Sequence, residues 1–254
     1  MRAIHWGAAA MLSAAAVLPA REAAAQTGFN GVITFTDYWR DGKPSTFVQT
    51  TKGHKVRLDG MGGQQGSMIV DGDAKVMTMV EPEQKKYITM TDEDMKQTQA
   101  MMAPMMEKMK AMHQAKHSDS GKLSFSNTGR IETVAGVPCQ VWRGVYAGAD
   151  QKKEEGDACV ASGVGFALAE LTFANPLAQP GQAGYEQFEQ YRQLVGGNKG
   201  ILRITKIEDG KTVPQLEATK IEPKVVSDDA FKPPAGYTEV KLGDMIRQGQ
   251  SRKN

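Results

Sequence analysis

The sequence is poor in the residues that most catalytic and metal sites use. Its 254 residues include four histidines and two cysteines, and His5 lies in the N-terminal segment discussed below. A weak nucleophile needs a neighbouring base to react. The sequence also has no Gly-x-Ser-x-Gly turn, no phosphate-binding loop and no Gly-x-Gly-x-x-Gly motif after a strand. We therefore expect a protein that is not an enzyme and that needs no cofactor.

Long apolar runs are also missing. The apolar stretch at residues 8–20 is too short to cross a bilayer, and no later stretch approaches the roughly 20 residues that a membrane-spanning helix needs. The formal net charge of +2 is close to neutral, so composition points neither to nucleic acid nor to an acidic membrane surface. We predict no transmembrane segment and no nucleic-acid partner.

Residues 1–25 have the pattern of a signal peptide. A positive charge at Arg2 precedes the apolar stretch, and an Ala-Ala-Ala cleavage site ends at Ala25. Because Gln26 rather than a cysteine follows the cut, no N-terminal lipid anchor is expected. We predict cleavage near Ala25, a periplasmic location and a single domain over residues 26–254.

Export would place the two cysteines where a disulfide persists. A hairpin centred near Ala149, with residues 151–157 as its charged tip, sets Cys139 directly opposite Cys159 on neighbouring strands and within bridging distance. A redox-active pair is the alternative, but the sequence lacks the Cys-x-x-Cys spacing that lowers a thiol pKa. The pattern favours a structural disulfide.

Alternation of apolar and polar residues predicts strands on both sides of a methionine-rich stretch. Strands are expected over residues 29–39, 46–52, several within 54–90, and 122–127, 130–135, 138–147, 158–161, 201–208 and 215–223. Helices are expected over residues 91–118, 166–174 and 184–195. This segregated order favours an antiparallel α+β domain over a parallel α/β domain.

The insert at residues 91–118 is the most unusual part of the sequence. Thr91 is a good N-cap, and Asp94 follows three residues later in an arrangement like a capping box. Pro104 must either kink the helix or begin a second one. Helical spacing places four methionines in one seam: Met102, Met105, Met109 and Met112. We expect this helix to cover the apolar face of the sheet.

Three interpretations of the methionine seam stay open. Methionine is a good helix former and core filler, so the first is ordinary core packing. In the second, its flexible, polarizable side chains form a binding face for varied apolar ligands. In the third, thioethers bind Cu(I) or Ag(I), together with two histidines one helical turn apart. The ligand set would then be Met105, Met109, Met112, His113 and His117.

Several short segments resemble known families. They are Arg57-Leu58-Asp59, Met68-Ile69-Val70-Asp71, Lys85-Lys86-Tyr87, Val134 to Cys139, Cys159-Val160-Ala161 and Phe231 to Tyr237. Together they resemble an exported domain-of-unknown-function family and, more distantly, the LolA, LolB and RseB class of lipoprotein carriers and sensors. The resemblance spans most of residues 29–240. It implies a curved antiparallel LolA-like half-barrel, covered on its concave face by helices, that takes acyl chains and has no catalytic residue.

We therefore predict a non-enzymatic periplasmic protein that binds a lipid or a lipoprotein acyl chain between the sheet and the methionine-rich helix. Met102, Met105, Met109 and Met112 are the predicted contacts on the helix, and Phe35, Val80 and Trp142 are those on the sheet. A soft-metal protein that uses the helix is one alternative. An envelope protein that docks a protein partner on the helix is the other.

Overall fold

The computed structural model describes residues 29–38, 43–63, 65–94, 96–97, 100, 122–147, 153–165, 185–196 and 198–242. The predicted signal peptide, the predicted helix over residues 166–174 and most of the methionine-rich insert lie outside this part of the chain. Within it, no helix is both long and apolar enough to span a membrane.

The described residues form strands for most of their length. The strands are β1 (Gly31–Asp37), β2 (Ser45–Lys52), β3 (Lys55–Asp59), β4 (Ser67–Asp71), β5 (Val76–Glu81), β6 (Lys86–Thr91), β7 (Lys122–Val134), β8 (Val137–Ala147), β9 (Lys153–Ser162), β10 (Lys199–Glu208), β11 (Lys211–Pro223) and β12 (Thr238–Glu239). The helical elements are the 3₁₀ turns η2 (Met61–Gly63) and η5 (Asp228–Phe231) and the α-helix α2 (Tyr185–Val195).

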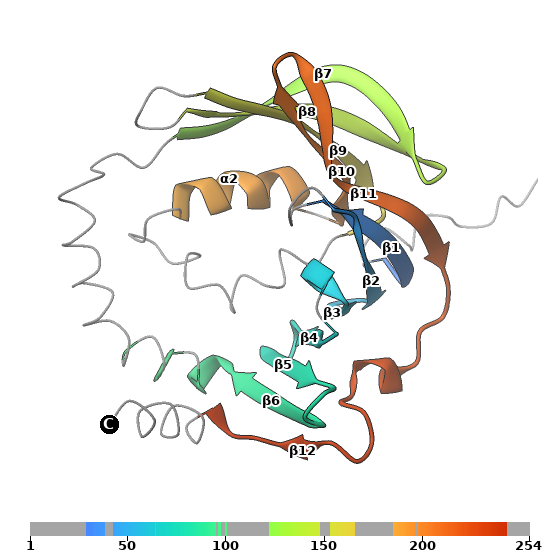
Figure 1. The fold of residues 1–254 in the computed structure, drawn as a ribbon, viewed down its shortest axis with the longest axis vertical. Helices are drawn as coiled ribbons and strands as arrows, with labels where there is room; N and C mark the ends of the chain where they lie inside the picture. Colours follow the sequence, from blue (N-terminus) through green and yellow to red (C-terminus); the bar gives the residue numbers. More distant parts are fainter. Residues whose placement is uncertain are drawn as a thin grey trace, which may run out of the picture.

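Twelve strands of the described part join in one open sheet, in the order β12-β6-β5-β4-β3-β2-β1-β11-β10-β9-β8-β7. Neighbouring strands are antiparallel, except that the short strand β12 pairs in parallel with the edge strand β6. In Figure 1 the strands follow an arc, with β7 to β10 at one end and β4 to β6 at the other.

Tight turns explain why several of these hairpins form. Asp209 and Gly210 connect β10 to β11 with φ angles of 49° and 73°, and Ala135 and Gly136 connect β7 to β8 with φ angles of 47° and 81°. Positive φ at both central residues of a two-residue turn matches the twist of the flanking strands. Glycine adopts such angles without a steric penalty. Gly210 and Gly136 therefore suit the second position of their turns.

Strand register divides the sheet into two faces, because residues directly opposite each other point to the same side. One side, which we call the helix face, carries Trp142, Ala158, Ile204, Leu216, Ala218, Phe35, Phe47, Gln49, Leu58, Met68, Met79 and Ile88. Their sequence neighbours point to the other side, the opposite face, which carries Val141, Cys159, Arg203 and Val80.

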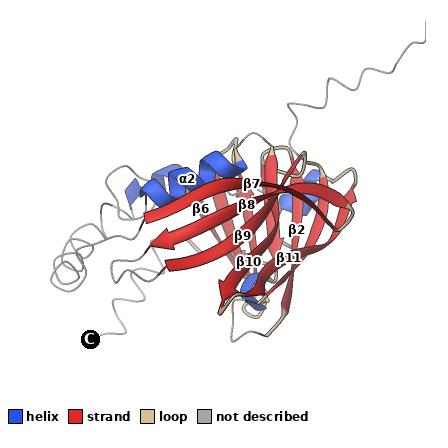
Figure 2. Cartoon of the chain, turned by 90° about the horizontal axis from the view of Figure 1, so that it is seen from above, coloured by secondary structure: helices blue, strands red, loops and turns tan. Residues whose placement is uncertain are grey.

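Helix α2 packs on the helix face. Its Leu194 and Val195 are buried in one cluster with Ala158, Val160 and Ile201 of the sheet. In Figures 1 and 2 the helix lies along β7 to β10, and in Figure 1 it is on the inner side of the arc. Helix α2 therefore covers the helix face at the end of the sheet formed by β7 to β10, and not at the end formed by β4 to β6.

The centre of the sheet holds the larger buried cluster. Phe35 is fully buried and stacks on Phe47, with ring centroids 5.0 Å apart and ring planes 13° from parallel. Burying an aromatic side chain of this size contributes about 1.5–3 kcal/mol. This stack connects the two halves of the sheet through β1 and β2, and it is core rather than an open surface.

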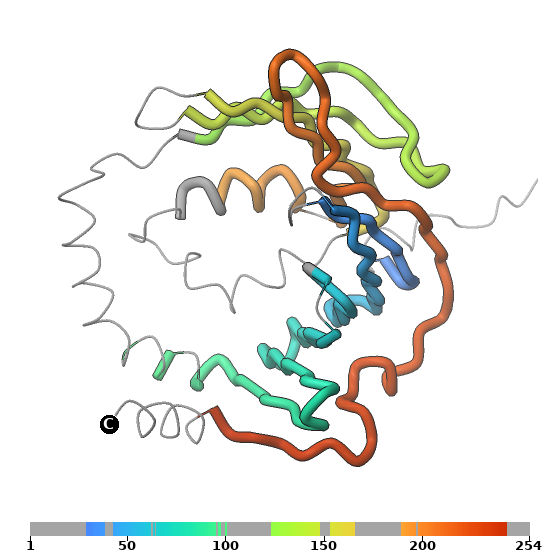
Figure 3. Tube along the Cα trace, viewed as in Figure 1, coloured from blue at the N-terminus to red at the C-terminus, as the bar shows by residue number. Residues whose placement is uncertain are grey.

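The C-terminal segment crosses the opposite face of β3 to β5. Arg57 donates a hydrogen bond from Nη1 to the carbonyl oxygen of Ala230 at 3.2 Å, and its Nε is 2.8 Å from Asp59 Oδ1. Lys52 Nζ is 2.9 Å from Asp228 Oδ2 at the start of η5. The chain then turns to add β12 at the edge of the sheet, outside the arc in the trace of Figure 3. The edge strand β6 is thereby partly paired, which limits edge-to-edge association.

The large open antiparallel sheet with few helices is confirmed, and the expected helix over residues 184–195 is present as α2. At the start of the insert, Thr91 and Asp94 form the predicted reciprocal cap: Thr91 N donates to Asp94 Oδ2 at 2.9 Å, and Asp94 N donates to Thr91 Oγ1 at 3.1 Å. The finer expectation, a LolA-like half-barrel covered by helices on its concave face, stays a prediction.

The predicted disulfide between Cys139 and Cys159 is present, with the two Cα atoms 5.3 Å apart. Its predicted register is wrong, because Cys159 is opposite Val141 rather than opposite Cys139. The bond therefore joins residues that are diagonal on neighbouring strands. Disulfides persist in oxidising compartments, so this bond supports an exported protein.

The predicted charged hairpin tip at residues 151–157 is also wrong over most of its length. Strand β9 begins at Lys153, and its acidic residues are paired with β8. Arg143 lies opposite Asp157 and also reaches Glu155, with an Nη1 to Oε2 distance of 3.3 Å. Opposite charges on neighbouring strands stabilise a sheet, and this pairing extends the strand through residues whose composition is typical of a loop.

Replacing both Cys139 and Cys159 by alanine should lower the free energy of unfolding by about 3 kcal/mol, because the bond closes a loop with a sequence separation of 20. Urea denaturation measures the change. The unaltered protein in excess reductant is the matched control and should give the same value. Unfolding that is identical with and without the bond would contradict a stabilising role.

Candidate functional site

A pocket of about 380 Å³ lies between α2 and the end of the sheet that carries β7, β8 and β10. Its apolar lining comes from Phe125 of β7, Trp142 of β8 and Leu194 of α2. Its polar lining comes from Ser124, Gln190, Gln193 and Lys199. Pockets that bind small molecules are typically of this size and combine an apolar wall with a few polar groups. The pocket is therefore our candidate binding site.

The sheet wall of the pocket depends on a glycine. Phe125 is directly opposite Gly144, where an added Cβ would lie 3.2 Å from the edge of the Phe125 ring. Trp142 belongs to the same face of β8 and is opposite Ala158. Small residues next to both aromatic rings leave room for the rings against the sheet. Phe125 and Trp142 remain half-buried, so each offers surface to a ligand.

The helix wall is apolar where it meets the sheet. Leu194 is 6% exposed, and the ring of Tyr191 approaches that of Phe125 with centroids 6.5 Å apart. Burial raises the pKa of the Tyr191 phenol far above its usual value, so this side chain stays neutral at any physiological pH. A neutral aromatic group beside the pocket suits an apolar guest.

The pocket also has a polar rim. Lys199 begins β10, is exposed, and has no ion-pair partner among the described residues. The side-chain oxygen Oε1 of Gln190 is buried and has no hydrogen-bond partner in the described part of the chain. A buried acceptor without a partner is costly and uncommon. A ligand that places a polar or anionic group at this rim would find both a cation and amide groups.

The structure separates the three sheet residues that the sequence predicted for the site. Trp142 lines the pocket, whereas Phe35 is on the same face but fully buried in the central stack. Val80 is 3% exposed and belongs to the opposite face, because its neighbour Met79 is opposite Met68 and Ile88. The remaining predicted contacts and alternative metal ligands lie outside the described residues: Met102, Met105, Met109, Met112, His113 and His117.

Sequence reasoning did not select Phe125, Leu194, Gln190 or Lys199. The apolar spacing of residues 184–195 predicted the helix, but that pattern alone cannot tell which strands the helix faces. The whole of β8 and β9 separates Phe125 from Leu194 along the chain, and only the packing of α2 on the sheet brings them together. Among the described residues, no three side chains of His, Cys, Asp or Glu cluster, and the predicted methionine and histidine ligands lie outside them.

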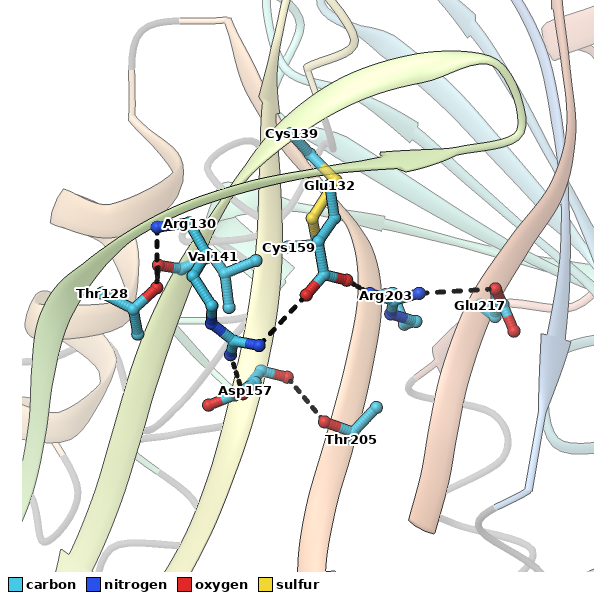
Figure 4. The surroundings of a disulfide bond; sticks show 10 residues. All are labelled: Thr128, Arg130, Glu132, Cys139, Val141, Asp157, Cys159, Arg203, Thr205 and Glu217. Atoms are coloured by element: carbon cyan, nitrogen blue, oxygen red, sulfur yellow. Dashed lines mark hydrogen bonds and ion pairs between the residues drawn. A yellow bond between two sulfur atoms is a disulfide. The ribbon is translucent and has the colours of Figure 1, made fainter. Parts of the chain in front are cut away.

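A second pocket, of about 290 Å³, lies on the opposite face beside the disulfide. Charged residues of its walls pair with one another and with neighbouring strands (Figure 4). Arg130 Nη2 and Arg143 Nε each lie 2.5 Å from an oxygen of Asp157, and Arg203 bridges Glu132 and Glu217. Because these charges already neutralise one another, the cluster is better suited to holding strands together than to binding a ligand.

A hydroxyl group shapes the edge of this cluster. The register of β7 against β8 shifts between Asn127 and Ile131. Within the shift, Thr128 Oγ1 donates to the carbonyl oxygen of Val141 at 2.7 Å and accepts from the backbone N–H of Arg130 at 3.2 Å (Figure 4). The sequence predicted two strands here, over residues 122–127 and 130–135. One strand with a bulge is present instead, because this hydroxyl bonds to the backbone groups that the bulge leaves free.

Comparison with known proteins identifies the family. A family model described as "Domain of unknown function (DUF4412)" matches residues 29–237. The chain belongs to the DUF4412 family. The expected membership of a domain-of-unknown-function family is thereby confirmed. No curated protein matches this DUF4412 chain.

Among solved structures, the DUF4412 chain is similar to the crystal structure of MucB, with 12% sequence identity and a TM-score of 0.37. The similarity covers 85% of the DUF4412 chain and 60% of the MucB chain. The DUF4412 chain thus spans well under two thirds of MucB.

The charged cluster of the DUF4412 chain predicts a pH-dependent stability. Partial burial favours the neutral form of Asp157, but the hydrogen bonds and charges of Arg143 and Arg130 outweigh it and hold the pKa of this carboxyl below 3.8. The stabilisation is therefore complete above the unfolded-state pKa, and it is lost as the pH falls through the lower folded-state pKa.

Asp157→Asn should consequently lower the free energy of unfolding by about 2 kcal/mol at neutral pH, and the loss should shrink as the pH falls below about 4. Urea unfolding over this pH range measures it. Glu222→Gln, which breaks the exposed pair with Lys220, is the control and should change little. A loss from Asp157→Asn that is the same at pH 7 and at pH 2 would show that the ion pairs are not the cause.

Proposed function

We propose that this DUF4412 protein is a non-enzymatic periplasmic protein that binds one acyl chain on the helix face, beside α2. The observation that carries the proposal is the pocket itself, whose apolar lining consists of Phe125, Trp142 and Leu194. The acyl chain would belong to a free lipid or to a lipoprotein. The signal peptide predicted to end near Ala25 would bring the protein to the compartment where both occur.

The size of the pocket agrees with part of an acyl chain as the guest. Each methylene group that leaves water contributes about 0.8 kcal/mol, and ordering the chain offsets part of that gain. A preformed pocket lowers the ordering cost, because its walls belong to a sheet and a packed helix. Half-buried aromatic rings that already face the cavity need no rearrangement before a ligand binds.

The polar rim orients such a ligand. An acyl chain that enters along Trp142 and Leu194 leaves its polar end near Lys199 and Gln190, where a carboxylate or phosphate is paired and an amide or hydroxyl is hydrogen-bonded. A cationic ligand would meet Lys199 and would be repelled. The proposed ligand is therefore an amphiphile with one apolar chain and a neutral or anionic head.

The methionine-rich insert enters this proposal as an extension of the apolar surface. Its segment begins directly after β6, at the helical cap formed by Thr91 and Asp94. The predicted contacts of Met102, Met105, Met109 and Met112 with the ligand stay predictions. The pocket at α2 does not depend on them, so ligand binding beside Trp142 and ligand binding at the insert can be measured separately.

A brominated fatty acid should quench the fluorescence of Trp142. Trp6 belongs to the predicted signal peptide, so Trp39→Phe leaves Trp142 as the single tryptophan after cleavage near Ala25. We would titrate this variant with a long-chain acid brominated near its middle. Quenching that saturates at one equivalent is expected, since bromine would lie against the ring. The unbrominated acid is the control and should reverse the effect by competition. No quenching, or quenching that does not saturate, would contradict the proposal.

Lys199→Gln should weaken the binding of palmitate about twofold to fivefold, as expected for an exposed ion pair. The same substitution should leave the binding of a neutral alcohol with the same chain unchanged. Competition against a fluorescent fatty acid measures both affinities. Lys211→Gln removes a comparable exposed charge outside the pocket and serves as the control. Equal weakening by the two substitutions would show that only the net charge matters.

A further inference from the structure

Four methionines lie side by side on the helix face of β4, β5 and β6. Met68 of β4 is directly opposite Met79 of β5, and Met77 of β5 is directly opposite Met90 of β6. Met77 and Met79 are two residues apart on one strand, so all four side chains point to the same side of the sheet. We call them the sheet methionines.

Met68 packs against the larger buried cluster, whereas Met77, Met79 and Met90 belong to neither buried cluster. Met79 is 45% exposed, and Met68, Met77 and Met90 are half-buried. Their aliphatic neighbours on the same face behave differently, since Val70 is 1% exposed and Ile88 is 8% exposed. The C-terminal segment covers the opposite face of these strands and helix α2 covers the other end of the sheet. Met79 therefore offers accessible surface on the side of the sheet that holds the apolar pocket.

The register brings the sulfur atoms within reach of one another. Directly opposite residues have Cβ atoms about 4.5–5.5 Å apart, and diagonal neighbours are about 7–8 Å apart, which long side chains can span. Met77 and Met79 are thus each beside one outer methionine and diagonal to the other. Three thioethers, those of Met77, Met79 and either Met68 or Met90, can converge on a single point above the sheet.

A convergent set of thioethers selects a particular class of ion. Thioether sulfur is a soft, uncharged ligand that prefers Cu(I) and Ag(I) over hard cations such as Mg²⁺ or Ca²⁺. Because a thioether has no proton to lose, its affinity for a metal does not depend on pH over the range in which histidine titrates. The methionine side chain is also flexible enough to adopt the geometry that the ion requires.

We infer that the sheet methionines form a binding site for one soft monovalent ion, Cu(I) or its analogue Ag(I), with Met77 and Met79 as the shared ligands. This site is distinct from the proposed acyl-chain pocket and from the predicted metal set of Met105, Met109, Met112, His113 and His117. Strand β5 pairs with β4 on one side and with β6 on the other, so the sheet itself positions the four methionines.

Titration with Ag(I) followed by isothermal calorimetry tests the inference, and Cu(I) under anaerobic conditions with a chromophoric competitor repeats it. We expect the Met77→Leu/Met79→Leu variant to bind one equivalent less than the unaltered protein. Leucine nearly conserves volume and apolarity, so folding and quenching of Trp142 by the brominated acid should be retained. The difference of one bound ion between the variant and the unaltered protein should be the same at pH 5 and at pH 7.5.

Met61→Leu is the matched control, because Met61 is 44% exposed but lies in η2 rather than on β4, β5 or β6. It should bind the same number of ions as the unaltered protein. If the Met77→Leu/Met79→Leu variant keeps its full stoichiometry and affinity, the inference is overturned. A difference in bound ions between this variant and the unaltered protein that is present at pH 7.5 and absent at pH 5 would also overturn it, since that behaviour belongs to histidine ligands.

Discussion

The need to keep one face of an open sheet away from water governs this structure. Side chains alternate along every strand. The helix face is mainly apolar, whereas the opposite face carries the charged cluster together with buried apolar residues such as Val141 and Val80. The chain covers the two faces differently. Helix α2 packs over the strands from β7 to β10, and the C-terminal segment binds across β3 to β5 from the opposite face. Neither element covers the helix face of β4 to β6. The pocket lies at the edge of α2, where the helix stops covering the sheet.

This arrangement makes ligand binding a consequence of incomplete coverage. A fully packed face would leave aromatic rings such as Phe125 and Trp142 without accessible surface, whereas both are half-buried at the margin of α2. The charged cluster around Asp157 and the disulfide holds the same strands from the other side. Rigid strands on one side and a helix on the other give a preformed cavity, and a preformed cavity lowers the entropic cost of ordering a flexible chain.

Local patterns predicted much of the fold, but little of the site. Alternation located nearly all strands, and the capping residues Thr91 and Asp94 marked the start of the insert. The acidic residues of β9 have a composition typical of a loop, and the sequence alone does not show that Arg143 pairs with them. The Cys139–Cys159 bond was predicted with the wrong register. Both errors concern which residues face each other across strands, which a single strand does not encode. The same holds for the site, because Trp142 joins Leu194 only through the packing of α2 on β8.

The most direct test of this account is a crystal structure of the protein with a long-chain fatty acid that carries bromine near the middle of its chain. Anomalous scattering from bromine locates the chain without reference to any other feature of the map. One bromine peak is expected on the helix face, in contact with Trp142 and Leu194. A peak on the opposite face beside Asp157, or a pocket closed by protein side chains with no bromine in it, would contradict it.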